Sequence, residues 1–397
     1  MKTLFIISLL ISGLYLVILT IMTVIYRPRP DRSPRNSRGK NLRAYPPVSI
    51  LKPIKGVDDD LEANLESFYQ LDYPVYEILY AVDDWQDKAV EIIRKVSQRH
   101  PRIRSRILAT GHHPTDNPKI HKLDFMEKES FGRLLWAVDA NVRVEPDTLR
   151  RLTDEYLEGG ARLVFSPVLG TGSRSFASLM ENTSLNFFTS GNVIALWKLF
   201  SQPVVVGKSM LIDRVALRTF GGFSYIKDYL AEDYILGKSF VDSGFKVSTN
   251  FIWVTNINRR TTFRGFYKRL ARWARLRYQL HRSAYLLEIL LNPVIMALAG
   301  LVIFGKEFWP LILATISVKI FLEYFNFLAV NRPDRRQLVN HLSFPLMVLL
   351  KDIILFAVYL APFFSTSVDW RGGRIKVGRN SLIYRLGRLE KLAYEEV

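Results

Sequence analysis

The chain contains four long apolar runs that are nearly free of charge, and a more polar middle part lies between the first run and the second. They extend over Leu4–Tyr26, Ala284–Phe304, Trp309–Val330 and Leu342–Phe364. About 20 apolar residues in a helix cross the hydrocarbon core of a bilayer, whereas shorter runs are typical of buried core helices. The first run is longer than a signal-peptide core, and no cleavage site of small residues follows it. We therefore expect a retained N-terminal anchor and further membrane segments towards the C-terminus.

Between the first and second runs, short apolar stretches alternate with amphipathic ones. The predicted strands are Val48–Leu51, Ile78–Val82, Ile107–Ala109, Leu134–Val138 and Leu163–Ser166, and the predicted helices are Leu61–Gln70, Asp87–Gln98 and Pro146–Leu157. Strands that alternate with helices indicate a mainly parallel sheet covered on both faces. The predicted fold class is therefore α/β, flanked by an N-terminal transmembrane anchor and C-terminal membrane helices.

Two stretches of this middle part resist a clear interpretation. Residues 171–206 are rich in aromatic and apolar side chains but show no regular period. A further strand is predicted at Val204–Val206, directly before Gly207-Lys208-Ser209. The glycine-rich loop that precedes a nucleotide-binding Gly-Lys-Ser is absent, so this tripeptide alone indicates no phosphate site.

The net charge of +18 is concentrated in three stretches, residues 27–43, 259–282 and 365–397, each of which borders an apolar run. This arrangement favours contact with anionic lipid headgroups and a cytoplasmic position of the basic flanks. No nucleic-acid partner is expected, because basic residues for that purpose cluster on a soluble face. The chain has no cysteine, which excludes disulfides, thiolate metal sites and a cysteine nucleophile.

The basic stretch 259–282 has the spacing of an amphipathic helix. Phe263, Phe266, Leu270 and Trp273 recur at steps of three and four residues, with basic residues off that stripe. Such a helix lies in the plane of a membrane surface, and the alternative is a solvated basic helix packed on the α/β domain.

The topology after this helix contains a conflict. If all three later runs cross the membrane, the basic tail lies on the side opposite the α/β domain, although its charge favours the same side. We expect an even number of crossings there. Asn292-Pro293 interrupts one run and Lys351-Asp352 places charges inside another, but the sequence does not decide which run departs from spanning.

Six segments are predicted from these boundaries. They are a transmembrane anchor at 1–26, a basic linker at 27–47, an α/β domain at 48–258, an amphipathic interface helix at 259–282, membrane-embedded helices at 283–364 and a basic tail at 365–397.

Acidic residues stand at predicted strand ends or in loops, as Asp83-Asp84, Asp139 and Glu232-Asp233. Ligands of parallel sheets bind outside the carboxyl ends of the strands, so these groups can converge on one crevice. Converging carboxylates suit either a divalent metal that neutralises a diphosphate or general-base activation of a hydroxyl. His112-His113 lies in a polar loop and is expected to be solvated, so we expect oxygen-ligated Mg²⁺ or Mn²⁺.

A basic and aromatic signature follows at Arg269-Leu-Ala-Arg-Trp273. Arg269, Arg272 and Trp273 lie about one helical turn apart. Guanidinium groups there can stabilise phosphate oxygens as a leaving group departs.

The chain resembles the ceramide glucosyltransferases, which form family 21 within the GT-A superfamily. The matching motifs run in family order over residues 46–376: Val48-Ser-Ile-Leu-Lys-Pro-Ile-Lys-Gly-Val-Asp58, Leu71-Asp-Tyr-Pro74, Asn117-Pro-Lys-Ile120, Asp139 with Val144-Glu-Pro-Asp-Thr-Leu149, Ala231-Glu-Asp-Tyr234, Arg269-Leu-Ala-Arg-Trp273 and Trp370-Arg-Gly-Gly-Arg374. The resemblance implies a GT-A catalytic domain at 48–258 that faces the cytosol. It implies inverting transfer of glucose from UDP-glucose to the primary hydroxyl of ceramide.

The resemblance also implies roles for single residues. Asp84 resembles the family aspartate near the nucleotide, with its neighbour Asp83 as a secondary candidate. Asp139 resembles the aspartate that helps to hold the metal and diphosphate, and Asp233 resembles the general base. This sequence departs from wider GT-A habit because Ala140-Asn141, rather than a second aspartate, follows Asp139.

Arg269, Arg272 and Trp273 match the Q/R-x-x-R-W signature, which contributes to the sites for the donor diphosphate and the acceptor. Glu232 and Lys119 are further secondary candidates. The implied partners are a UDP-sugar and a membrane lipid. The alternative acceptors are a hopanoid, a diacylglycerol or a polyprenyl phosphate, and the alternative class is a non-catalytic membrane scaffold. A bacterial cytoplasmic membrane and a Golgi membrane both agree with the sequence.

Overall fold

A computed structural model describes residues 2–28, 44–111, 117–249, 251–330, 338–370 and 373–385. His112-His113, most of the predicted linker and the end of the basic tail lie outside the described residues. Arg371-Gly372 of the C-terminal motif also lies outside them.

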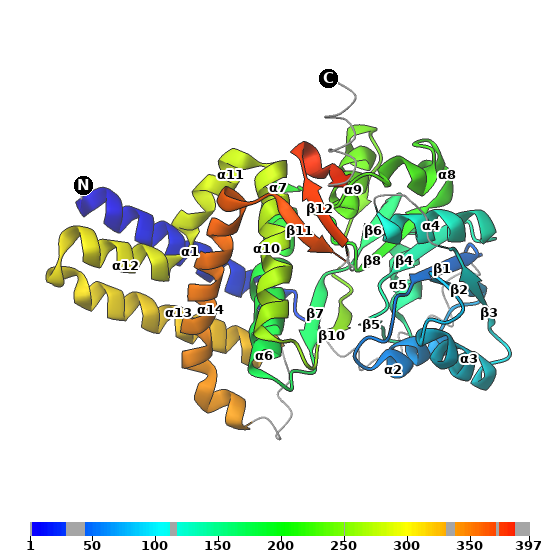
Figure 1. The fold of residues 1–397 in the computed structure, drawn as a ribbon, viewed down its shortest axis with the longest axis horizontal. Coiled ribbons are helices and arrows are strands. Elements are labelled where there is room, and N and C mark those ends of the chain that lie inside the picture. The colour runs from blue at the N-terminus through cyan, green and yellow to red at the C-terminus, as the bar shows by residue number, and fades with distance from the viewer. Residues whose placement is uncertain are drawn as a thin grey trace.

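A seven-stranded sheet in the order β3-β2-β1-β4-β8-β6-β9 forms the centre of the α/β part (Figure 1). Its strands are β1 (Val48–Pro53), β2 (Tyr76–Val82), β3 (Arg104–Ala109), β4 (Leu134–Val138), β6 (Leu163–Phe165), β8 (Ser209–Asp213) and β9 (Val247–Ser248). The pairs β1–β2, β2–β3, β1–β4 and β6–β9 are parallel, whereas β8 is antiparallel to both of its neighbours. The mainly parallel sheet confirms the predicted α/β class.

Both faces of the sheet are buried, because successive side chains of a strand point to opposite faces. On β1, Ile50 packs on one face with α2 (Leu61–Glu66), α3 (Ala89–Arg99) and α5 (Thr148–Gly159). The next residue, Leu51, packs on the other face with α4 (Pro118–Glu129), α8 (Arg214–Arg218) and α9 (Glu232–Asp242). Two hydrophobic cores therefore enclose the sheet, as the continuous apolar strands predict.

The strand predicted at Val204–Val206 is wrong, because the chain is irregular there and β8 begins only at Ser209. The stretch without a regular period before it is helical. It forms α6 (Phe176–Ser184), a π-helical turn (Leu185–Thr189) and α7 (Ser190–Phe200). Almost all of α6 is buried, so its polar residues mark no solvent face and no amphipathic period arises.

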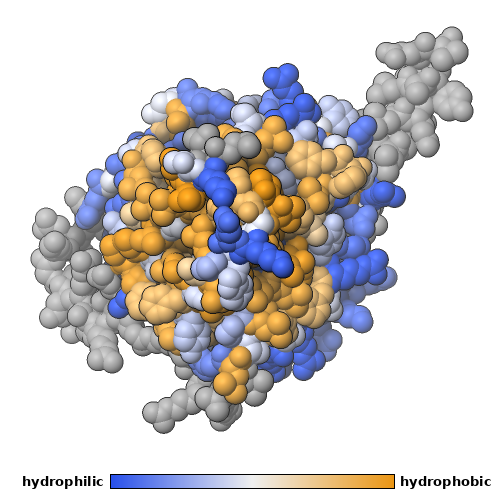
Figure 2. Space-filling view, turned by 90° about the vertical axis from the view of Figure 1, so that its left-hand side faces the viewer, coloured by the Kyte–Doolittle hydropathy of each residue, from blue (hydrophilic) through white to orange (hydrophobic). Residues whose placement is uncertain are grey.

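Four apolar helices gather at the end of the molecule opposite the large sheet (Figure 1). They are α1 (Lys2–Ile25), α12 (Pro293–Phe304), α13 (Trp309–Val330) and α14 (Leu338–Phe364). Figure 2 shows that apolar side chains cover most of this end, with a strip of hydrophilic groups through its middle. Leu10, Val302 and Leu342 are each exposed by more than half. An apolar surface of this extent indicates contact with lipid.

Three described segments are long and apolar enough to cross a bilayer, namely Phe5–Ile25, Lys306–Val330 and His341–Phe364. The remaining apolar run is broken between Arg282–Leu291 and Pro293–Phe304, which meet at 73°. Asn292 caps α12 by accepting hydrogen bonds from two backbone amides, so the chain restarts a helix at Pro293. The break falls at the Asn-Pro pair that the sequence singles out.

Four charged side chains are buried between α13 and α14. Lys319, Glu323, Lys351 and Asp352, which we call the membrane cluster, have side chains no more than 2% exposed. Lys319 Nζ lies 2.9 Å from Glu323 and 3.2 Å from Asp352, and Lys351 pairs with Glu323. Charges at membrane depth pair in this way because isolated ions are costly there.

Helix α10 (Phe263–Leu280) carries the basic signature and lies between the α/β part and α14 (Figure 1). It follows β10 (Val254–Ile257), which forms a small sheet with β5 (Val142–Arg143) and β7 (Val168–Thr171). On the predicted apolar stripe, Phe266 is buried against α6 and α14 residues, whereas Phe263 is 48% exposed. Most of that stripe therefore packs against protein.

A third sheet closes the described chain with β11 (Ser367–Trp370), β12 (Gly373–Val377) and β13 (Ile383–Arg385). Leu230 packs into its core, and the backbone amide of Leu230 donates to Ser381 at 2.9 Å. The C-terminal sheet thereby supports the segment that leads directly into Glu232-Asp233.

Candidate active site

The candidate site lies beside β1, at the position where the next strands along the chain are added on opposite sides. The chain passes from β1 to β2 on one side and later returns to β4 on the other side of β1. Such a switch point leaves a crevice at the carboxyl ends of the strands, where ligands of α/β sheets bind. Asp83 directly follows β2 and Asp139 directly follows β4. The topology therefore brings both predicted carboxylates to the same edge.

Lys119 joins the acidic residues of this edge. It stands in the first turn of α4, where the Asn117 side chain caps the helix by accepting from the amides of Lys119 and Ile120. Its Nζ lies 3.1 Å from Asp139 Oδ1 and 3.1 Å from Glu232 Oε1. We call the group Lys119, Lys208, Asp139, Glu232 and Asp233 the cleft cluster.

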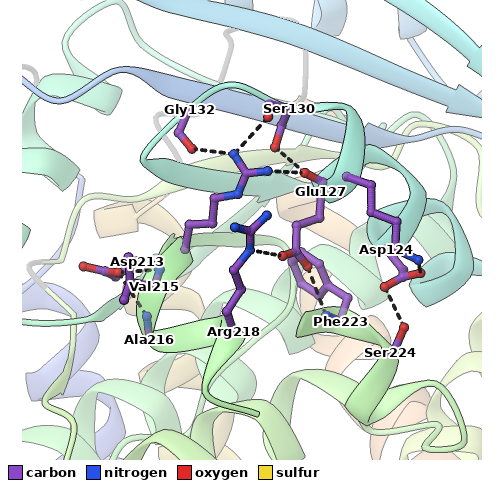
Figure 3. A network of polar contacts seen from close by, with 12 residues as sticks. Asp124, Glu127, Ser130, Gly132, Asp213, Val215, Ala216, Arg218, Phe223 and Ser224 are labelled. Carbon is purple, nitrogen blue, oxygen red and sulfur yellow. Dashed lines mark hydrogen bonds and ion pairs between the residues drawn. The ribbon is translucent and has the colours of Figure 1, made fainter. Parts of the chain in front are cut away.

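The position of Lys119 depends on how α4 is held at its far end, which Figure 3 shows. Glu127 accepts hydrogen bonds from Arg218 Nε and from the amide of Phe223. Arg214 donates to the carbonyl oxygens of Glu127, Ser130 and Gly132. This network fixes α4 to α8 and to the turn after it, and so sets the direction from which Lys119 enters the site.

Asp233 lies in the first turn of α9, where the helix dipole favours a carboxylate. Its Oδ2 accepts from the amide of Gly207 at 2.6 Å, and its Oδ1 accepts from the amide of Tyr234 at 2.8 Å. Burial, and then the neighbouring charge of Glu232, raise the pKa of Asp233 to about 6, against the opposing effect of Lys119. A carboxylate with this pKa is a competent proton acceptor near neutral pH.

Gly207 holds this geometry because it has no side chain. A Cβ atom at this position would lie 2.9 Å from Asp233 Oδ2 and 3.0 Å from Asp233 Cβ. The Gly207 carbonyl also accepts from Lys119 Nζ at 3.1 Å. The backbone of this one residue therefore contacts both Lys119 and Asp233 of the cleft cluster.

Asp139 is held by a lysine on each carboxylate oxygen. Lys119 lies 3.1 Å from Oδ1 and Lys208 lies 3.0 Å from Oδ2. Burial tends to raise the pKa of Asp139, but the two ammonium groups outweigh it and hold the pKa far below its usual range. Asp139 is therefore an anion at every physiological pH.

Lys52, on β1, donates a hydrogen bond from Nζ to the backbone carbonyl of Asp139 at 3.2 Å. Its ammonium also lies 3.6 Å from the centre of the Phe68 ring. Burial lowers the pKa of Lys52 to about 7.

The two neighbouring aspartates after β2 have different surroundings. Asp84 is exposed and accepts a hydrogen bond from the amide of Gln86, as a turn residue does. Asp83 lies 2.7 Å from Lys122 and 3.3 Å from Lys55. Burial tends to raise the pKa of Asp83, and these lysines lower it below its ordinary value. Of the pair, Asp83 is directed into the lysine-rich edge.

On α10, Arg269 pairs with Glu181 of α6, and Glu181 also accepts from Thr261 at 2.6 Å. Burial lowers the pKa of Arg269 from its usual value. A cleft of about 310 Å³ extends from Arg269 to Asn141, which accepts from Lys208 at 3.0 Å. Through Asn141, the cleft beside the signature helix adjoins Lys208 of the cleft cluster.

The remaining signature residues differ in their surroundings. Trp273 is partly buried against the core that α2, α3 and α5 cover, and the charge of Arg272 adds to the effect of burial in lowering the pKa of Arg269. Sequence reasoning missed four residues that contact the site: Lys52, Gly207, Lys208 and Glu181. Lys52 carried a signal, since it is a lone charge inside an apolar strand, whereas the others are recognisable only from their partners in space.

These features define a membrane-associated α/β enzyme with an acidic and lysine-rich crevice at its sheet edge. The sequence matches the family described as Glycosyl transferase family 21 over residues 4–383. The chain belongs to this family and is a glycosyltransferase and a membrane protein.

Curated relatives agree with this assignment. Ceramide glucosyltransferase 1 of Caenorhabditis elegans is 26% identical over 94% of this chain and 80% of its own length. Ceramide glucosyltransferase 3 of the same organism is 24% identical over 84% of this chain and 73% of its own length.

Among solved structures, the mannosyltransferase PcManGT of Pyrobaculum calidifontis, in complex with GDP-Man and Mn²⁺, aligns with 90% of this chain and 99% of its own at 15% identity and a TM-score of 0.49.

Proposed function

We propose that the protein transfers glucose from UDP-glucose to the primary hydroxyl of ceramide, with inversion at the anomeric carbon. The observation that carries the proposal is Asp233, a partly buried carboxylate that two backbone amides hold beside Lys119 and whose pKa is raised to about 6. The names of the relatives support glucose as the sugar and ceramide as the acceptor.

In this mechanism Asp233 is the general base. It accepts the proton of the lipid hydroxyl while that oxygen attacks the anomeric carbon. The bond between the anomeric carbon and the diphosphate oxygen breaks on the opposite face, and UDP departs with the bonding electron pair. The Gly207 and Tyr234 amides orient the carboxylate, so its proton-accepting oxygen is fixed before the acceptor arrives.

Cationic side chains stabilise the charge that develops on the departing diphosphate. Arg269 and Arg272 of α10 take this role, and Trp273 of the same helix contributes to the acceptor site. Near the nucleotide, Asp83 is the better candidate than Asp84, because it faces the lysine-rich edge whereas Asp84 lies in an exposed turn. Glu232 holds Lys119 in place.

The residues present fit a divalent metal bound together with substrate. Asp139 and Asn141 supply oxygen atoms within reach of one ammonium group, Lys208. Mg²⁺ in such sites takes one or two protein ligands plus phosphate oxygens and water. No cluster of three or more acidic or histidine ligands occurs among the described residues, and a bound diphosphate and water would supply the other ligands. Bound Mg²⁺ or Mn²⁺ supplies charge stabilisation for the leaving group.

The apolar helices support a position of the site close to the membrane surface. We propose that the α/β domain lies on the cytoplasmic side, where its basic flanks meet anionic headgroups. The acceptor then enters along α10 without leaving the bilayer completely.

A competition assay tests the proposal. Purified protein is given equal amounts of ceramide, diacylglycerol, a hopanoid and a polyprenyl phosphate with each of several UDP-sugars, and the glycolipids are identified by mass spectrometry. Glucosylceramide as the main product supports the proposal. If another glycolipid is the main product, the proposed acceptor or sugar is wrong and the product identifies the correct one. If none of these lipids stimulates UDP release, the protein does not transfer sugar to them.

A further inference from the structure

The Gly207-Lys208 segment, which the sequence left without a role, contacts the site at two points. Gly207 donates to Asp233, and Lys208 pairs with Asp139. Lys208 Nζ lies 3.0 Å from Asp139 Oδ2 and 3.0 Å from Asn141 Oδ1. One ammonium group therefore bridges the first and third positions of Asp139-Ala140-Asn141.

These two oxygen atoms are the ones that a divalent cation would use. A carboxylate oxygen and an amide oxygen brought to one point form a hard-cation donor pair. The third position is an uncharged amide, so Asp139 is the single carboxylate of this donor pair, and Lys208 lies across the pair.

Lys208 also has access to the crevice. Its side chain is 23% exposed and that of Asp139 is 24% exposed, so neither group is sealed in the core. A lysine side chain has a flexible stem with three rotatable donors, which lets it contact a phosphate without losing the carboxylate.

We propose that Lys208 is an internal cation of the sugar-donor site, which binds the diphosphate and competes with a divalent metal for Asp139 and Asn141. This inference rests on the proposed UDP-sugar function. Lys208 gives the enzyme a diphosphate affinity that does not depend on metal. It also weakens metal binding to the enzyme before the nucleotide arrives.

The test compares wild type with Lys208→Met, which keeps the length of the side chain and removes its charge. Calorimetry measures UDP binding in EDTA and in Mn²⁺, and electron paramagnetic resonance measures Mn²⁺ binding to the nucleotide-free enzyme. A charge-assisted hydrogen bond corresponds to about tenfold to a hundredfold in affinity. We expect UDP affinity in EDTA to fall by about that factor, and Mn²⁺ affinity of the free enzyme to rise.

Two controls make the result specific. Lys95→Met removes the same charge from the exposed pair between Lys95 of α3 and Glu62 of α2, and leaves both affinities unchanged. Lys208→Arg keeps the charge and retains metal-independent UDP binding. Circular dichroism and thermal unfolding establish that each variant is folded.

Each outcome has a separate meaning. Unchanged UDP and Mn²⁺ affinities in folded Lys208→Met overturn the inference and leave the proposed function intact. Equal losses of UDP affinity in EDTA and in Mn²⁺, without tighter Mn²⁺ binding, also overturn it, because Lys208 then does not compete with metal. Absence of UDP binding to wild type under both conditions contradicts the proposed function itself.

Discussion

The cleft cluster and the membrane cluster are built from the same residue types, yet they differ in access and in charge balance. Side chains of the cleft cluster such as Lys119 and Asp139 are 11% and 24% exposed, whereas no side chain of the membrane cluster exceeds 2%. The membrane cluster contains two lysines and two carboxylates. The cleft cluster contains two lysines and three carboxylates, so its own charges do not cancel.

The backbone positions of the two clusters differ as well. The residues of the membrane cluster stand in the middle of α13 and α14, and Lys319 and Glu323 are one turn apart. Those of the cleft cluster stand at element ends, in the first turns of α4 and α9 and next to β4 and β8. Element ends leave backbone amides available for substrate-like groups. Buried charge alone therefore does not indicate a site, whereas unbalanced charge at open element ends does.

The comparison predicts its largest effect for Asp233→Asn. The variant loses the proton acceptor but keeps the shape of the side chain, so transfer falls by about a thousandfold, as removal of a general base typically causes. UDP-sugar binding stays within a few-fold of wild type because Asp139 and the basic groups remain. Radiolabelled glycolipid formation and calorimetry measure the two quantities.

Asp242→Asn is the matched control, since Asp242 ends the same helix and pairs only at the surface with Lys238. It should retain full activity. Turnover like that of wild type in Asp233→Asn would remove Asp233 from the base role.

For the membrane cluster, the comparison predicts that a substitution lowers the stability of the fold but leaves the rate of sugar transfer unchanged. Glu323→Ala leaves Lys351 without its partner and Lys319 with only Asp352. Removal of one member of a buried ion pair costs about 3–5 kcal/mol of unfolding free energy. Denaturation in detergent micelles measures this cost, and kcat of the folded fraction should equal that of wild type.

The control for this variant is Glu307→Ala, which removes an exposed partner of Lys2. Surface pairs contribute about 0–1 kcal/mol, so unfolding should hardly change. If Glu323→Ala instead lowers kcat of fully folded protein, the membrane cluster acts in the reaction and the contrast between the clusters fails.

Some features of the two clusters could be predicted from the sequence, and others depend on contacts between segments that are distant in the sequence. Strand ends were predictable, because apolar runs stop at Asp83 and Asp139. The contact of Lys119 with Asp139 and Glu232 was not, because it joins α4, β4 and α9 across the sheet edge. The motif alone favoured Asp84 over Asp83 as the aspartate near the nucleotide. Which of the two side chains points into the site depends on the register of β2 with its neighbours, and the motif does not contain this information.

The membrane region shows a similar limit. The Asn292-Pro293 break was predictable, since proline restricts the residue before it and begins a new helix. The partners of Lys351-Asp352 were not, because Lys319 and Glu323 come from a different apolar run. Helix α6 escaped prediction because burial on all sides removes amphipathic periodicity.

A smaller effect is expected for Gly207→Ala, which displaces Asp233 without removing it. The new methyl group would contact the carboxylate at 2.9 Å, so the side chain or the backbone must move. A misplacement of about 1 Å at a catalytic group can cost a hundredfold in rate. Single-turnover transfer rates measure the loss.

Gly13→Ala in α1 serves as its control, because a Cβ there meets nothing within 4 Å. This control should transfer the sugar at the wild-type rate. An equally active Gly207→Ala would mean that the Gly207 amide does not set the orientation of Asp233.

The smallest expected effect is the pH dependence of the cleft cluster. The proposed base, Asp233, can accept a proton only when it is deprotonated, and burial and the charge of Glu232 raise its pKa to about 6. Transfer at saturating substrate should therefore be nearly constant above pH 7 and fall about tenfold for each pH unit well below 6. Glu232 raises the pKa of Asp233, so Glu232→Gln should move the midpoint to lower pH while the protein stays folded. A midpoint that does not move in this variant would assign the titration to a group outside the cleft cluster, because only charge close to Asp233 shifts its protonation.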